Sequence, residues 1–334
     1  MPPIEASVSS RVTVAILSDV HYAGPAERAR GNDYEQRVIS NSLLRAMVRI
    51  FRYFIWMRQP LEQGVQLDRF LNEVGPEDYV VANGDFSCDS GFVGVSDDAA
   101  FQSAQECLGK LRAQFGDRVH FTIGDHELGK LAFLGGNGGM RLASWARATE
   151  SLGLKAFWQM PIGNYVLMGV ASPLIALPAN QPDTLAEEWA EWMKLRDEHL
   201  AEIRAAFDQL KPEQRVILFC HDPTALPFLW REESVRCRLP QIEQTIIGHL
   251  HTRLILWKSR LLSGIPPVGF LGNSIRKFTS ALNEARHWWP FRVRICPALS
   301  GIELLNDGGY YTMEIDPAAK LAAQFKFHPL PRRN

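Results

Sequence analysis

The stretch Gly248-His249-Leu250-His251 decides the fold of this chain, and it closes the apolar run Gln244-Thr245-Ile246-Ile247. Two histidines one residue apart at a strand end point to opposite sides of the backbone, so they serve one centre only if the chain turns at once. Gly248 permits such a turn. Neutral imidazoles are frequent metal ligands, and together with Asp and His at other strand ends they build two-metal centres. The stretch therefore predicts one part of a metal site.

Four further apolar runs of strand length lie upstream, and each ends in Asp, His or both. They are residues 12–18 before Asp19 and His21, residues 79–83 before Asp85, residues 119–123 before Asp125 and His126, and residues 216–220 before His221. Open α/β sheets collect their ligands at the C-terminal ends of strands. A single Asp-x-His or Gly-Asp is usually only a strand-end turn with a capping Asp. Five such ends in order indicate a shared metal centre.

The order of these motifs resembles the signature of the calcineurin-like metallophosphoesterases across residues 12–253. We therefore expect an α/β fold, a four-layer α-β-β-α sandwich of two mixed sheets, with a dinuclear metal centre at the strand ends. The resemblance implies a ligand set, namely Asp19, His21 and His251 for one ion, Asp125, His221 and His249 for the other, and Asp85 as the bridge. His126 would stand beside the phosphate as proton donor or charge stabiliser, and water would attack phosphorus in line with the leaving oxygen.

The resemblance is imperfect at Asp125, where the family usually has Asn. A carboxylate in place of an amide keeps the ligand but adds a negative charge, which should tighten metal binding and weaken the Lewis acidity of that metal. Two divalent ions are expected, with Mn²⁺ first and Mg²⁺, Fe or Zn²⁺ also suited to Asp and His ligands.

The bulk composition is that of an ordinary globular protein, with 46% hydrophobic and 22% charged residues in 334. We expect a single domain over residues 1–334. No run of about 18 apolar residues predicts a membrane span, and residues 1–11 do not read as a secretory signal. Five scattered cysteines favour reduced thiols. These features predict a cytoplasmic protein, and they assign no oligomeric state.

The net charge of −1 conceals two basic, apolar insertions, at residues 36–61 and 253–296. The first has five Arg and no acidic residue, and the second has eight Lys or Arg and one Glu. Wrapped as a helix, residues 43–58 separate a broad apolar face from Arg45, Arg49, Arg52 and Trp56. Such a helix lies in a membrane interface or packs on the sheet with a solvated basic face.

The second insertion favours lipid, because bulky apolar residues alternate there with cations. Its expected membrane- or substrate-binding residues are Arg276, Lys277, Trp288 and Trp289, beside Arg45, Arg49 and Arg52 of the first insertion. Trp and Arg also stack on single-stranded nucleic acid, but the wealth of Leu, Ile and Phe makes this the weaker interpretation. The expected partners are thus an anionic membrane surface, at the inner face of the cell membrane, and a lipid-linked phosphate substrate.

Several other elements are predicted from periodicity and caps. Helices are expected at residues 97–115, 139–152 and 184–210, a strand at residues 165–170, and a C-terminal hairpin of residues 310–315 and 321–327 that closes the second sheet.

Within the family, the chain looks most like the UDP-2,3-diacylglucosamine hydrolases of lipid A synthesis, on the two insertions and on the Gly-Asp-x-Ser-Cys-Asp pattern of residues 84–89. That resemblance implies attack of water on the α-phosphorus of a pyrophosphate, with release of UMP and 2,3-diacylglucosamine 1-phosphate. Three alternatives remain open: a soluble phosphodiesterase or nuclease, an enzyme for another lipid-linked phosphate, and a catalytically silent binding module with Asp125 as its support.

Overall fold

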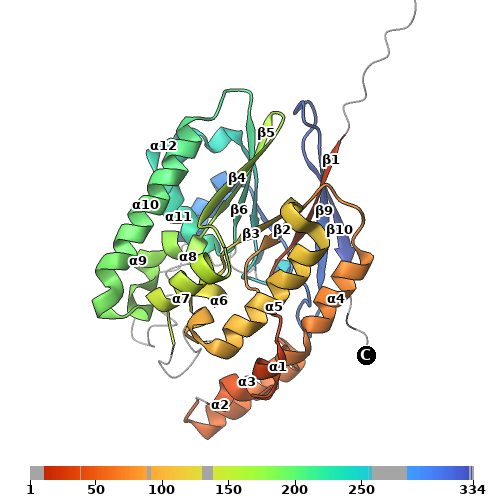
Figure 1. The fold of residues 1–334 in the computed structure, drawn as a ribbon, viewed down its shortest axis with the longest axis vertical. Coiled ribbons are helices and arrows are strands. Elements are labelled where there is room, and N and C mark those ends of the chain that lie inside the picture. The colour runs from red at the N-terminus through yellow and green to blue at the C-terminus, as the bar shows by residue number, and fades with distance from the viewer. Residues whose placement is uncertain are drawn as a thin grey trace, which may run out of the picture.

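The chain is built around two five-stranded mixed sheets that face each other (Figure 1). The computed structural model describes residues 11–37, 39–88, 92–129, 138–254, 256–257, 284–330 and 332. The first sheet has the order β10-β9-β1-β2-β3 and contains β1 (Val12–Leu17), β2 (Tyr79–Asn83), β3 (Val119–Thr122), β9 (Gly309–Ile315) and β10 (Gln324–Pro329). The second has the order β4-β5-β6-β7-β8 and contains β4 (Phe157–Ile162), β5 (Tyr165–Val170), β6 (Arg215–Cys220), β7 (Ile242–Ile247) and β8 (Val293–Ile295).

Each sheet contains a group of neighbouring parallel strands. Strands β1, β2 and β3 are parallel neighbours, and so are β5, β6, β7 and β8. The C-terminal ends of parallel strands meet at one edge of a sheet, so three of the predicted motifs gather at an edge of the first sheet and two at an edge of the second. The two edges lie together, because Asp85 and Asp125 are close to His221 and His249.

Buried apolar side chains form three clusters, one between the two sheets and one between each sheet and the helices that cover it. A core between the sheets joins Val14 and Ile16 of β1 to Leu167 of β5 and Phe219 of β6. The outer side of the first sheet is covered by α4 (Gly64–Glu73) and α5 (Asp98–Phe115), and that of the second by α10 (Trp189–Asp208) and α11 (Leu226–Arg231). The expected α/β class, with two mixed sheets flanked by helices, is confirmed.

The remaining helices are short, with the exception of α3. They are α1 (Pro25–Arg28), α2 (Tyr34–Arg37), α3 (Ser42–Phe54), α6 (Asp125–Leu128), α7 (Leu142–Ala146), α8 (Ser172–Ile175), α9 (Leu177–Asn180) and α12 (Glu233–Cys237). The described part of the chain has no helix with both the length and the apolar character needed to cross a bilayer.

Three predicted elements differ from the structure. The helix expected at residues 139–152 is a short α-helix, α7, followed by a π-helix at Arg147–Ser151. The C-terminal hairpin was expected to close the second sheet, but β9 pairs antiparallel with β1, so the hairpin completes the first sheet. The predicted helix at 184–210 begins at Trp189, because Ala186–Glu188 forms a 3₁₀ turn before it. The strand at residues 165–170 and the helix ending at Phe115 agree with the prediction.

Helix α3 turns its apolar side outward, which reverses the usual arrangement of an amphipathic helix on a globular protein. The apolar face of α3 consists of Leu43, Met47, Ile50, Phe51 and Phe54, and these side chains are between 47% and 71% exposed. The arginines on the other side form hydrogen bonds within the protein: Arg45 donates to the carbonyl of Ile39, and Arg49, although exposed, donates to Gln36 Oε1. Helix α3 therefore does not pack on the sheet through its apolar face.

Two residues expected to contact a membrane are buried. Arg52 is only 7% exposed, because it lies on the inward side of α3. Trp288 is 4% exposed and packs in the core cluster that contains Leu229 and Phe291, whereas its neighbour Trp289 is 63% exposed. The prediction of lipid contact is wrong for Arg52 and Trp288. Arg276 and Lys277 lie outside the described residues.

Candidate metal centre

The residues expected to bind metal stand at strand ends in an uncommon backbone conformation. Positive φ angles are found at Asp19 (49°), His21 (47°), Asp85 (58°), His249 (56°) and His251 (57°). A residue other than glycine held in the left-handed region costs about 1–3 kcal/mol, and such residues gather at functional sites. The chain therefore turns sharply after β1, β2 and β7, and it directs these side chains into one place.

The first group of ligand atoms comes from Asp19, His21 and His251, which are all buried. The Nε2 atoms of the two histidines face each other at 3.2 Å, and Asp19 Oδ1 lies 3.4 Å from His251 Nε2. Asp19 Oδ2 is buried and accepts no hydrogen bond within the described residues. A carboxylate oxygen and two imidazole nitrogens that converge in this way suit a divalent cation.

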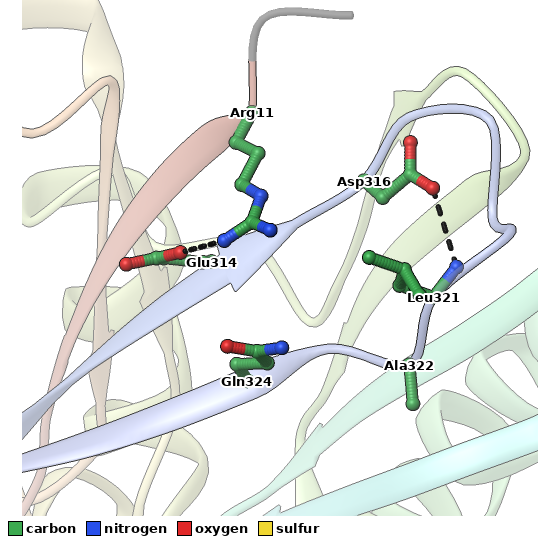
Figure 2. A pocket seen from close by; sticks show the side chains of 6 residues that line it. All are labelled: Arg11, Glu314, Asp316, Leu321, Ala322 and Gln324. Carbon is green, nitrogen blue, oxygen red and sulfur yellow. Dashed lines mark hydrogen bonds and ion pairs between the residues drawn. The ribbon is translucent and has the colours of Figure 1, made fainter.

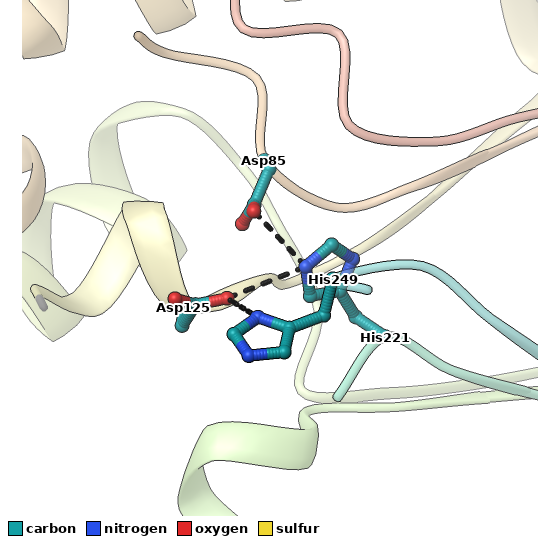
Figure 3. Close-up of side chains that lie close together, drawn as sticks. All are labelled: Asp85, Asp125, His221 and His249. Atoms are coloured by element: carbon teal, nitrogen blue, oxygen red, sulfur yellow. Dashed lines mark hydrogen bonds and ion pairs between the residues drawn. The ribbon is translucent and has the colours of Figure 1, made fainter. Parts of the chain in front are cut away.

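The second group comes from Asp85, Asp125, His221 and His249 (Figure 3). His221 Nε2 lies 3.0 Å from Asp85 Oδ2 and 3.3 Å from Asp125 Oδ1, and His249 Nδ1 lies 2.9 Å from Asp125 Oδ1. His249 and His251 thus serve different groups, although only Leu250 separates them in sequence.

Asp85 lies where the two groups meet, and His126 stands beside it. His126 Nε2 is 3.7 Å from Asp85 Oδ2, and its ring centroid is 4.6 Å from that of His21. His21, Asp85 and His126 also bring ligand atoms together, so a coordinating role competes geometrically with the expected role of His126 beside the phosphate.

Gly248 is required for space rather than for the turn. Its φ is not positive, and the turn is made by His249 and His251. A Cβ at Gly248 would collide with Ser18 Oγ and lie 2.5 Å from Asp19 Oδ2. The expectation that Gly248 supplies the turn is corrected: the glycine lets β7 approach the end of β1.

Glu127 fixes the backbone of the site and was not singled out as a functional residue from the sequence. The carboxylate is completely buried and accepts hydrogen bonds from the backbone N–H groups of Gly124 (2.8 Å), Phe86 (2.8 Å) and Asp85 (3.1 Å). Burial, with the charge of Asp85, raises the pKa of Glu127 to about 7. Its position directly after the expected site residues Asp125 and His126 was the sequence feature that could have pointed to a role in the site.

The electrostatics of the centre favour added positive charge. Burial raises the pKa of Asp19. Burial lowers the pKa of His221, but the charges of Asp85 and Asp19 overcome this and raise it well above its usual range. Burial also lowers the pKa of His249, yet Asp125 raises it to about 10. In the metal-free protein these histidines hold protons that divalent ions would displace, so the donor set fits two such ions.

Trp56 closes one side of the centre, and the sequence placed it only on the polar side of a helix. Its ring centroid is 4.6 Å from that of His251. The loop after β8 holds Trp56 in place, since Glu303 N–H donates to its carbonyl at 2.8 Å. Sequence pattern carries no signal for this contact, because it joins residues nearly two hundred positions apart.

A surface recess elsewhere in the molecule is not a competing site. Figure 2 shows it between β9 and β10, lined by Arg11, Glu314, Asp316, Leu321, Ala322 and Gln324. Arg11 and Glu314 neutralise each other at 2.7 Å. The recess lies beside the start of β1, whereas the metal centre follows the end of that strand.

Comparison with known proteins agrees with the geometry of the centre. Residues 12–253 match the family of calcineurin-like phosphoesterases. Similar solved structures are a dimetal phosphatase from Danio rerio (13% identity, TM-score 0.46, 95% of each chain covered) and the phosphopantetheinyl hydrolase PptH from Mycobacterium tuberculosis (15% identity, TM-score 0.35, 73% of this chain and 84% of that one). Both are too distant to bear on the substrate. No curated protein matches the chain significantly.

Proposed function

The chain belongs to the calcineurin-like phosphoesterases, which hydrolyse phosphoester bonds with two divalent metals, and on that premise we propose that it cleaves a lipid-linked pyrophosphate at a membrane surface. The specific candidate is UDP-2,3-diacylglucosamine. Water would form a bond to the α-phosphorus, the pyrophosphate P–O bond would break, and UMP and 2,3-diacylglucosamine 1-phosphate would leave.

The apolar face of α3 is the observation that carries this proposal. A monomeric protein rarely exposes a contiguous row of large apolar side chains unless they meet a partner or a lipid. The same helix leads directly into Trp56, whose ring lies 4.6 Å from His251. An acyl chain held by α3 would thus leave the phosphates of the same molecule near the metal centre.

The charge near α3 supports an anionic lipid surface as the partner. Arg45 and Arg49 donate hydrogen bonds to neutral oxygen acceptors. The pKa of Asp33 is lowered by the hydrogen bond from Arg37, and the charge of Arg49 also contributes to lowering it. Residues 36–61 contain five Arg and no acidic residue. Anionic head groups complement this charge while the apolar face of α3 enters the acyl boundary. We place the protein at the inner face of the cell membrane.

The residues of the centre take the roles that the resemblance implies. Asp19, His21 and His251 would hold one ion, and Asp125, His221 and His249 the other, with Asp85 shared between them. When bound, the two ions polarise phosphoryl oxygens and lower the pKa of water. His126, which lies between His21 and Asp85, would donate a proton to the leaving oxygen or stabilise its charge. Mn²⁺ is the proposed metal.

The deciding experiment is ³¹P NMR of the protein with Mn²⁺ and UDP-2,3-diacylglucosamine in detergent micelles, with Asp85→Ala as control. We expect release of UMP by the native protein alone. If UMP is not released while a simple aryl phosphodiester is hydrolysed, the lipid-linked substrate is refuted and a soluble phosphodiesterase is favoured.

The membrane partner is tested by sedimentation with vesicles that contain anionic lipid. Arg45→Glu combined with Arg49→Glu should weaken association while leaving hydrolysis of a small soluble ester intact. Arg52 is left unchanged because it is buried. The matched control reverses two exposed lysines on the far side of the second sheet, Lys194→Glu and Lys211→Glu, with the same change in net charge. Equal loss of association in both pairs would refute a specific role for α3.

A further inference from the structure

Four rings form a continuous column from the metal centre to the apolar face of α3. His21 and His251 stack with centroids 4.9 Å apart, His251 and Trp56 are 4.6 Å apart, and Trp56 and Phe51 are 6.3 Å apart at an interplanar angle of 19°. Phe51 is 47% exposed and belongs to the apolar face of α3. The exposed apolar face of α3 is thus connected to two expected metal ligands, His21 and His251, through a series of ring contacts.

The backbone of Trp56 is held from two sides. Its N–H donates to the carbonyl of Phe51 at 3.1 Å, and its carbonyl accepts from Glu303 N–H at 2.8 Å. Glu303 is itself paired with Arg58 at 3.6 Å and with Arg332. The indole therefore moves with the end of α3 and with the loop after β8, which carries Glu303.

His251 needs such support because its own backbone does not favour its position. It follows β7 at a positive φ of 57°, and its ring must aim Nε2 at Asp19 Oδ1 and His21 Nε2. Trp56 and His21 both lie against the imidazole, with ring centroids 4.6 Å and 4.9 Å from that of His251. Two such ring contacts restrict the rotamers of His251 to the one that faces the ligand group.

We infer that Trp56 is a positioning residue for His251, and that the ring column makes metal binding and docking of α3 on an apolar surface mutually reinforcing. The second part rests on the proposed function, in which α3 meets lipid. When α3 docks on lipid, Phe51 and the end of α3 lose mobility. Because Phe51 contacts Trp56, the indole then stays against His251. Because linkage is reciprocal, whatever factor docking adds to metal affinity, metal binding adds to docking.

The positioning role is tested by equilibrium titration with Mn²⁺, without lipid or substrate. Trp56→Leu keeps an apolar side chain but removes the ring, and we expect affinity for one of the two ions to fall by about 10-fold. Trp56→Phe should recover most of the loss. Phe54→Ala, an exposed position of α3 outside the ring column, is the matched control and should bind both ions as the native protein does. Native affinity in Trp56→Leu would overturn the inference.

The coupling is tested with micelles of an uncharged maltoside detergent, which do not bind Mn²⁺ themselves. We expect micelles to tighten binding of one ion to the native protein by about 5-fold or more, and to leave Trp56→Leu unchanged. An equal effect in both, or none in the native protein, would overturn the coupling. Neither titration contains substrate, so a failure of UDP-2,3-diacylglucosamine as a substrate is distinguished from a failure of this inference.

Discussion

The adjacent tryptophans Trp288 and Trp289 provide a direct test of which part of the second insertion belongs to the core. Trp288→Ala would remove a side chain that is 4% exposed, whereas Trp289→Ala would alter one that is 63% exposed. A buried Trp removes about 150–250 Å² of surface from water, which at about 25 cal/mol per Å² gives an upper value of about 4–6 kcal/mol. Measured truncations of buried Phe or Trp lie at about 3–5 kcal/mol, and we expect Trp288→Ala to fall in that range.

The indole nitrogen of Trp288 refines this magnitude. Nε1 is buried and has no hydrogen-bond partner in the part of the chain that the structure describes. An unsatisfied buried donor already costs about 1–3 kcal/mol, so Trp288→Phe removes that penalty together with some apolar area. We therefore expect Trp288→Phe to cost less than about 1.5 kcal/mol and Trp289→Ala less than about 0.5 kcal/mol.

The assay is urea unfolding followed by circular dichroism, because a change in midpoint at constant slope reports stability alone. Vesicle sedimentation of the same variants shows whether either ring contacts lipid. Equal unfolding midpoints for Trp288→Ala and Trp289→Ala would refute a core position for Trp288, and so would native stability with lost vesicle binding in Trp288→Ala.

Three further predictions concern the metal centre. His126→Ala should lower kcat by about 10²- to 10⁴-fold with two ions still bound, as counted by elemental analysis; loss of one ion would instead assign His126 to coordination. With its pKa raised to about 10, His249 is protonated at pH 7 in the metal-free protein, so metal binding should release at least one proton and tighten as the pH rises toward about 10. Calorimetry in buffers of different protonation enthalpy measures this release, and heats independent of buffer would contradict it. Gly248→Ala places a Cβ 2.5 Å from Asp19 Oδ2 and should weaken metal binding by about 10-fold or more. The control is Gly109→Ala in α5, where a Cβ meets nothing within 4 Å, and this variant should bind metal normally. Equal metal affinity in both variants would show that the space at Gly248 is not needed.

The sequence determined the sheets and the metal centre because both depend on local patterns. Short apolar runs specify strands, and parallel strands place whatever follows them at a common edge. From their positions after strands, these residues could therefore be predicted to gather at one site, without knowledge of any long-range contact: Asp19, His21, Asp85, Asp125 and the three histidines after β6 and β7.

Only the tertiary structure decided how the basic, apolar segments are oriented. The periodicity of α3 separates two faces, but Gln36 and Ile39 accept hydrogen bonds from the arginines and so turn the apolar face outward. Trp288 and Trp289 are indistinguishable in a pattern, since their burial depends on side chains far away in sequence. The same holds for β9, which crosses to β1, and for Trp56, which reaches His251. Helical and strand periods specify which residues share a face, whereas the partner of that face is set by packing between segments distant in the chain.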